Sequence, residues 1–230
     1  MGVLLMLMTI GGLFFAVILL IAARITKRGW LARFVGYAVG IWFVFYAVML
    51  LGSSFTSKER IVEVGDTDGK AFCGFYLDCH MHAMVTGVRT AKSVGDRKAN
   101  GTFYIVGVRV FSDAKNPNVA LHLLEPKARV VNPAGGYFER DAQAESQLPS
   151  ATARLDTDIH NTETLEKEIV FDLPIGVAQP KLLITEGYGI DKTIEHVLPG
   201  DEDSLFHAQT FFGLSESREV GTVAGGPTAE

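Results

Sequence analysis

The chain has 230 residues, 48% of them hydrophobic, and carries 26 acidic residues against 21 Lys and Arg, for a formal net charge of −5. All the acidic residues and 17 of the basic ones follow residue 55, so that part of the chain has a net charge of −9. An acidic surface disfavours nucleic acid and anionic lipid headgroups, and we expect no nucleic-acid partner.

Two long stretches near the N-terminus contain no charged residue. Residues 3–23 form a stretch of 21 and residues 34–55 a stretch of 22, and each exceeds the ~20 apolar residues that a helix needs to cross a ~30 Å hydrocarbon core. Backbone groups in lipid must be paired within their own segment, so both stretches should be helical. A cleaved signal peptide followed by one anchor is the alternative, but no basic residue precedes the first stretch and no clean cleavage site follows it. The sequence therefore predicts a transmembrane helical hairpin over residues 1–55.

The connector between these stretches sets the predicted orientation. Residues 24–33 carry four positive charges and no acidic residue, whereas no basic side chain precedes residue 3. Short loops rich in Lys and Arg stay in the cytoplasm. We therefore expect a cytoplasmic loop, with both the N-terminus and everything after residue 55 on the exported side of the lipid bilayer.

Short runs of β-branched and aromatic residues fill the exported part. Turn sequences such as Asn-Pro, Gly-Gly and Pro-Ile-Gly separate them, which is typical of a β-sandwich. The predicted strands cover residues 60–64, 83–89, 101–111, 128–131, 167–173, 181–185 and 205–214. We expect a linker over residues 56–70, the sandwich over 71–215 and a flexible tail over 216–230, with a short helix at 141–148 and solvated turn residues at 201–203.

Three segments carry a family resemblance. NGTFYIVGVRVFSDAKNP, VVNPAGGYFERD and EIVFDLPIGVAQPKLLI follow one another in this order. Their pattern resembles the bacterial secreted immunoglobulin-like domains of unknown function found on lipoproteins and membrane anchors, over roughly residues 80–190. The resemblance implies an immunoglobulin-like sandwich without catalytic residues. The expected fold class is thus an α+β membrane protein, with a transmembrane helical hairpin followed by an all-β sandwich, in the bacterial inner membrane with its domain in the periplasm.

The stretch CGFYLDCHMH, residues 73–82, contains both cysteines of the chain. An exported domain lies in an oxidising compartment, which favours a disulfide between Cys73 and Cys79. Such a bridge closes a short loop and fixes a turn more than it holds the fold. Phe75 and Tyr76 then lie at the tip of the turn, as candidate aromatic contacts for a partner.

A copper site is the alternative for the same stretch. Copper sites of the blue or binuclear type combine Cys, two His and often Met, and Cys79, His80, Met81 and His82 supply these ligand types. A two-helix hairpin followed by an exported β-domain is also the topology of cytochrome oxidase subunit II. In an extended strand, however, His80 and His82 share one face, and Cys79 and Met81 point to the other.

The second apolar stretch contains Gly36 and Gly40, at a spacing that allows another helix to approach closely. That helix is either the first one of the hairpin or a helix of a partner protein. No motif for a hydrolase, a P-loop enzyme, a zinc protease or a dinucleotide-binding enzyme is present. We therefore expect a non-catalytic accessory subunit, without a cofactor, of a larger integral-membrane protein complex, with the copper or redox module as the alternative.

Overall fold

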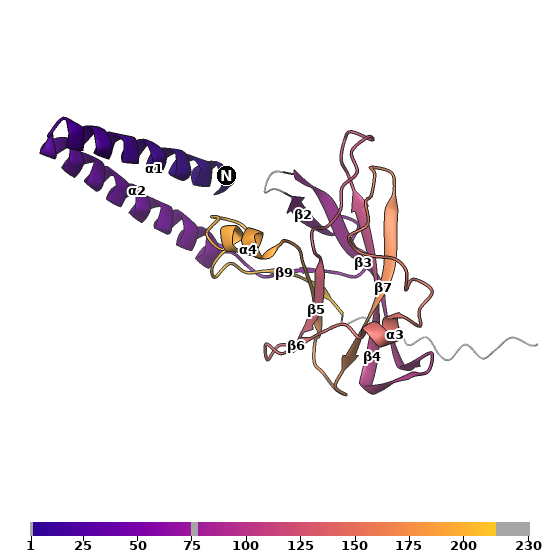
Figure 1. Cartoon of the computed structure of the whole chain (residues 1–230). Helices are drawn as coiled ribbons and strands as arrows, with labels where there is room; N and C mark the ends of the chain where they lie inside the picture. The colour runs from indigo at the N-terminus through magenta and orange to yellow at the C-terminus, as the bar shows by residue number, and fades with distance from the viewer. Residues whose placement is uncertain (1, 75–77, 215–230) are drawn as a thin grey trace, which may run out of the picture. The chain divides into compact units, whose positions relative to one another are not determined.

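The computed structural model describes residues 2–74 and 78–214 (Figure 1). The chain divides into two compact units. One contains the residues up to Arg60 together with Tyr188–Gln209, and the other contains Ile61–Gly187 and the residues from Thr210 onward. The expected sandwich ran without interruption from residue 71 to 215, whereas in the structure Tyr188–Gln209 groups with the N-terminal helices.

Two helices form most of the first unit. They are α1 (Gly2–Ile25) and α2 (Gly29–Thr56), which confirms the helices predicted at residues 3–23 and 34–55. Both helices are long and apolar enough to cross a membrane. Only 6% of the most apolar 18-residue stretch of each is buried inside the protein. The indole Nε1 of Trp42 donates a hydrogen bond to Thr9 Oγ1 at 3.0 Å and so ties α2 to α1.

The remainder of this unit is Tyr188–Gln209, which we call the cap segment. It begins with the short helix α4 (Gly189–Glu195), in which the Tyr188 amide donates to Asp191 Oδ2 at 3.1 Å. The strand predicted at residues 205–214 is present only as β9 (Thr210–Gly213), because Phe206 stacks on Phe55 of α2 and the Ala208 amide donates to Ser57, just after α2. Asp201, expected to be a solvated turn residue, is half-buried in this segment.

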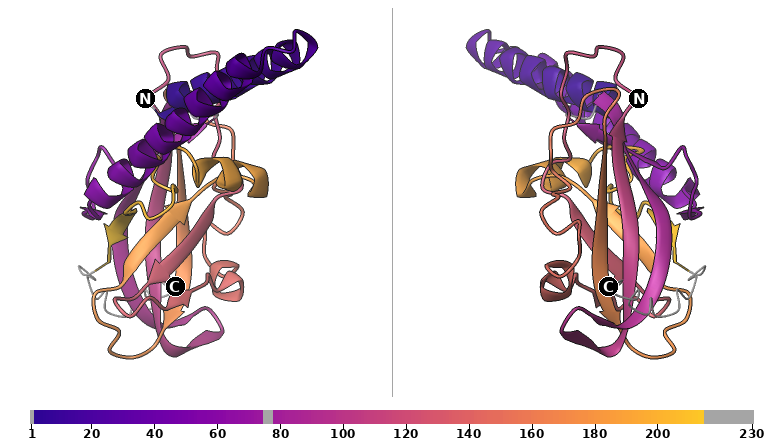
Figure 2. Two further views of the ribbon diagram at one scale, coloured as in Figure 1. Left: turned by 90° about the vertical axis from the view of Figure 1, so that its left-hand side faces the viewer. Right: turned by 90° about the vertical axis from the view of Figure 1, so that its right-hand side faces the viewer.

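The second unit contains two β-sheets (Figure 2). The five-stranded sheet has the order β1-β9-β8-β5-β6, and the four-stranded sheet has the order β2-β3-β4-β7. The bounds of the strands other than β9 are β1 Arg60–Val62, β2 Lys70–Gly74, β3 Asp78–Val94, β4 Arg97–Ser112, β5 Lys127–Val131, β6 Tyr137–Phe138, β7 Thr164–Leu173 and β8 Lys181–Thr185. All neighbours within the four-stranded sheet pair antiparallel.

The main core lies between the two sheets. Alternate residues of β4, namely Val106, Val108 and Val110, are at most 1% exposed and pack with Ile184 and Phe212 of the other sheet. This alternation is what period-2 patterning predicts for a strand with one face on a core. A buried cation also joins the sheets, since Lys70 Nζ of β2 donates to the carbonyl oxygen of Ile184 at 3.0 Å.

The outer face of the four-stranded sheet carries a second, smaller core. Phe103 and Ile105 of β4 pack there against Ala144 and Leu148, in and just after the helix α3 (Ala142–Glu145). The short helix predicted at residues 141–148 is therefore present over four residues. Its N-cap is Asp141, whose side chain accepts a hydrogen bond from the Ala144 amide at 2.9 Å.

The segment around α3 also covers the free edge of β7. The amide of Asp141 donates to the Val170 carbonyl at 2.8 Å, the Val170 amide donates to Glu145 Oε1 at 3.2 Å, and the Glu168 amide donates to Ser150 Oγ at 3.0 Å. An uncovered sheet edge is a template for pairing with another chain. We call residues 140–150 the edge strap, because they form hydrogen bonds with backbone groups of β7 that would otherwise be unpaired.

Candidate functional site

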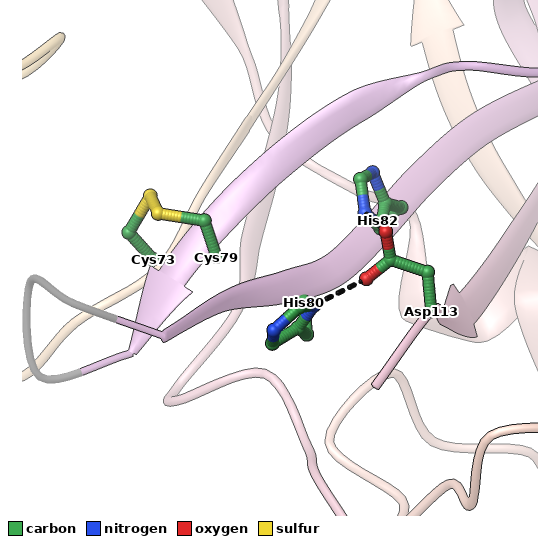
Figure 3. The surroundings of a disulfide bond; sticks show 5 residues. All are labelled: Cys73, Cys79, His80, His82 and Asp113. Atoms are coloured by element: carbon green, nitrogen blue, oxygen red, sulfur yellow. Dashed lines mark hydrogen bonds and ion pairs between the residues drawn. A yellow bond between two sulfur atoms is a disulfide. The ribbon is translucent and has the colours of Figure 1, made fainter. Parts of the chain in front are cut away.

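The hairpin formed by β2 and β3 ends in a disulfide. Cys73 and Cys79 are bonded, with an S–S distance of 2.02 Å (Figure 3), and no cysteine is free. The bridge lies where the register of the two strands shifts between Phe72 and Gly74. The candidate contact residues Phe75 and Tyr76 at the tip of this hairpin, and the tail predicted at residues 216–230, lie outside the described residues.

The two histidines that follow the disulfide lie beside one carboxylate. His80 Nδ1 and Asp113 Oδ1 are 2.6 Å apart, and His82 Nε2 and Asp113 Oδ2 are 3.4 Å apart. Figure 3 shows both imidazole rings next to the Asp113 carboxylate. Asp113 follows the end of β4, and its amide donates to the His80 carbonyl at 3.1 Å, so the pairing of β3 with β4 brings the three side chains together.

The two histidines have different surroundings. The side chain of His80 is 44% exposed, whereas that of His82 is 17% exposed and stacks on Phe111, with ring centroids 5.1 Å apart. Both ring nitrogens of His82 are buried without a hydrogen bond to protein. The hydrogen bond from His80, followed by the charges of both histidines, lowers the pKa of Asp113, which is largely exposed. The cluster therefore holds two imidazole rings against one carboxylate.

The structure does not bring the four proposed copper ligands together. Cys79 is bonded to Cys73 and offers no thiolate, which is the form of cysteine that binds metals. Met81 is 5% exposed and belongs to the core between the sheets, so it lies on the opposite face of β3 from His80 and His82. Among the described residues, no group of three or more His, Cys, Asp and Glu has a geometry that holds a metal ion.

A shallow hollow of ≈450 Å³ lies on the outer face of the four-stranded sheet. It forms where Gly87 of β3 and Gly107 of β4 are paired, next to a register shift. Glu168 borders it and accepts from Arg89 Nη2 at 2.9 Å. Glycine within a strand often marks such a place. The other charged side chains at its rim also have partners, since Glu166 pairs with Arg109 and Lys167 Nζ donates to the Ala153 carbonyl, so the hollow indicates no particular ligand.

The helical hairpin of α1 and α2 presents an apolar groove and an exposed face that contains two glycines. An apolar groove of ≈370 Å³ runs along the line where α1 and α2 meet, and its lining includes Gly12, Ala16 and Trp42. Gly36 and Gly40 of α2 are not among the residues that line this groove, and a Cβ placed at either position would have no neighbour within 4 Å. The contact with α1 uses other positions of α2, such as Trp42, so the close intramolecular approach considered for the two glycines does not occur.

The site was only partly visible in the sequence. The histidines and cysteines stand in one short run, but Asp113 is 31 positions beyond His82 and joins them only through the register of β3 and β4. A signal existed in the run SDAKNP that follows the strand predicted at residues 101–111, because a polar side chain at a strand end lies near the end of its antiparallel neighbour.

Comparison with known proteins finds no matching family model, no matching curated protein and no matching solved structure.

Proposed function

We propose that this protein is a non-catalytic, membrane-anchored accessory subunit of a larger integral-membrane complex. Its helical hairpin docks to the partner within the lipid bilayer, and its β-domain, an immunoglobulin-like sandwich in this proposal, lies on the exported side. The basic loop at residues 24–33 supports this orientation through the positive-inside rule. The Cys73–Cys79 bond supports it as well, since disulfides persist in oxidising compartments. A bacterial inner membrane with a periplasmic domain fits both features.

The observation that carries the proposal is the open face of α2 at Gly36 and Gly40. Small residues four positions apart let the backbone of another helix approach closely, and in lipid such packing is a main source of helix association. Both glycines have empty space where a side chain would project. Bulky exposed side chains lie beside them on the same helix, with Tyr37 at 73% and Ile41 at 72% exposure. One helix suffices as an anchor, so a second helix with an open glycine face is explained by a partner helix.

The experiment is capture of the complex from native membranes. The chain carrying a C-terminal affinity tag is extracted in a mild detergent, purified, and analysed by native gel electrophoresis and mass spectrometry. We expect a stoichiometric integral-membrane partner with the wild-type chain. Gly36→Leu combined with Gly40→Leu should remove it, because the new side chains fill the approach face.

A matched control is Gly11→Leu in α1, which also projects into open space. This variant should retain the partner at the wild-type level. Recovery of the wild-type chain only as a free monomer would contradict the proposal, and so would a partner that survives the double substitution in α2.

A further inference from the structure

The cap segment, Tyr188–Gln209, contacts the C-terminal half of α2 and Ser57, the residue that follows the helix. Tyr46 Oη donates to the Val197 carbonyl at 2.6 Å, and Ser54 Oγ lies 3.3 Å from the Ser204 hydroxyl. Further contacts are the Ala208 amide donating to Ser57 Oγ at 2.8 Å and the rings of Phe55 and Phe206 stacking at 5.9 Å. The contacts follow the helix for more than two turns, so the segment runs alongside α2 rather than touching only its end.

The position of Tyr46 gives the depth of this contact in a bilayer. If the hydrocarbon core begins after Arg33, Tyr46 lies about 18 Å along the helix axis, at 1.5 Å per residue. The core is about 30 Å thick, so Tyr46 lies about 12 Å below its exported boundary. Cβ atoms tilt toward the helix N-terminus, which here points to the cytoplasm. The Val197 carbonyl, bonded to Tyr46, therefore reaches acyl-chain depth, and Phe206, stacked on Phe55, lies at the boundary.

The surface of the cap segment suits this depth. Its exposed apolar side chains include Ile190 at 73%, Phe206 at 66%, Val197 at 48% and Leu205 at 43% exposure. They continue the apolar surface of α2, where Phe55 is 72% exposed. Isolated exposed apolar side chains are ordinary, but several on one short segment beside a membrane helix indicate an apolar environment.

Backbone pairing in the deepest part of the cap segment meets the requirement of lipid. The amide of Val197 donates to the Ile194 carbonyl oxygen at 3.1 Å. The amides of Leu198 and Leu205 donate, each at 3.0 Å, to the carbonyl oxygens of Glu195 and His196, respectively. The Tyr46 hydroxyl donates a hydrogen bond to the Val197 carbonyl oxygen. Irregular backbone is tolerated at membrane depth only where its polar groups are paired in this way.

One acidic side chain of the segment, Glu195, has surroundings that suit this location. Burial, followed by the charges of Asp203, Asp201 and Asp191, raises the pKa of Glu195 from 4.5 to about 7, although the charge of Lys192 acts in the opposite direction. Glu195 Oε2 is fully buried without a hydrogen-bond partner, although the residue as a whole is only partly buried. A carboxyl group that takes up a proton near neutral pH enters the interface without a charge.

We propose that the cap segment is a membrane-interfacial element that inserts Val197, Leu205 and Phe206 into the exported leaflet of the phospholipid bilayer. The inference rests on the membrane placement of α1 and α2 in the proposed function, but not on a protein partner. A partner protein covering the same surface is the competing occupant, and a system that contains only lipid and this chain separates the two.

The test reconstitutes the full chain into phosphatidylcholine vesicles that contain a phosphatidylcholine with a photoreactive diazirine on its acyl chain. After illumination, lipid adducts are mapped by mass spectrometry of peptides. We expect adducts on α1, on α2 and on residues 196–206, at several times the yield found on β4 of the β-domain. Adducts on both helices without adducts on residues 196–206 would overturn the inference and leave the membrane anchor intact. Helices without adducts would show instead that the membrane placement itself is wrong.

A matched pair of variants tests how the segment is held. Tyr46→Phe removes only the hydroxyl that binds the Val197 carbonyl, whereas Tyr37→Phe removes a hydroxyl from an exposed tyrosine of the same helix. The adduct yield on residues 196–206, relative to α2, should fall at least twofold in the first variant and stay unchanged in the second. Equal yields in the two variants would overturn the assignment of Tyr46 as the residue that fixes the depth.

Discussion

Removal of the Glu145 carboxylate should release the edge strap from β7. Glu145 is 6% exposed, and its Oε1 accepts from Arg140 Nε at 2.8 Å and from the Val170 amide at 3.2 Å. Its Oε2 pairs with Arg140 Nη2. One buried carboxylate thus satisfies a guanidinium and a backbone amide of the sheet edge. The substitutions Glu145→Ala and Glu145→Gln separate these two roles.

The expected loss of stability follows from these contacts. A hydrogen bond to a charged group contributes about 1.5–3 kcal/mol, and an orphaned buried amide costs about 1–3 kcal/mol. Breaking a buried ion pair typically costs about 3–5 kcal/mol. The Arg140 side chain is 30% exposed and regains water, so Glu145→Ala should lower the free energy of unfolding by about 3 kcal/mol. Glu145→Gln keeps an acceptor for Val170 and should cost about 1–2 kcal/mol.

The assay is urea unfolding of the full chain in detergent micelles, followed by far-ultraviolet circular dichroism of the strands. With a slope of about 2 kcal/mol per molar urea, the midpoint for Glu145→Ala should fall by about 1.5 M. Hydrogen exchange of β7 should accelerate at Val170 more than at Val106 in the centre of the sheet. An unchanged midpoint together with unchanged exchange at Val170 would refute the account of the edge strap.

Three further predictions concern other parts of the chain. Cys73→Ala combined with Cys79→Ala should leave the fold intact and lower stability by no more than about 2–3 kcal/mol, because the closed loop is short; a larger loss on urea unfolding would show that the bridge holds the fold. The pKa of Glu195 rises from 4.5 to about 7 in the folded chain, so its contribution to cap-segment stability is full below about pH 4.5 and is lost as the pH rises through about 7. Hydrogen exchange of residues 188–209, corrected for intrinsic rates, should therefore accelerate with pH in the wild type and not in Glu195→Gln, and equal profiles would contradict this. Lys70→Met should lower the free energy of unfolding by about 1–3 kcal/mol, because it withdraws the donor that Lys70 offers to the Ile184 carbonyl between the sheets; an unchanged urea midpoint would contradict it.

The elements that could be predicted are those whose pattern is local. The two helices were evident because long uncharged stretches leave a helix as the only way to pair the backbone in lipid. The strand predicted at residues 101–111 falls within β4, because its alternating valines bury one face. The strand predicted at residues 83–89 grows to seventeen residues in β3, since pairing with β4 extends it beyond its own apolar pattern.

The elements that could not be predicted depend on contacts between distant parts of the chain. The cap segment resembled the end of the sandwich, but its hydrogen bonds and stacking join it to residues about 150 positions earlier. Asp113 was not singled out from the sequence, because only the register of two strands places it beside His80 and His82. Gly36 and Gly40 were recognised as a packing surface, but their direction depends on which face of α2 meets α1.

The central claim is that the hairpin docks to a partner inside the membrane, and site-specific crosslinking in intact cells tests it most directly. A photoreactive amino acid at Ile41, beside Gly40 on α2, should give one dominant crosslink to an integral-membrane protein, and Gly36→Leu with Gly40→Leu should abolish it. The same probe at Phe14, an exposed position of α1, should give a weaker crosslink to that protein or none. Crosslinks from Ile41 to lipid alone, or a diffuse set of proteins that the double substitution does not change, would contradict the claim.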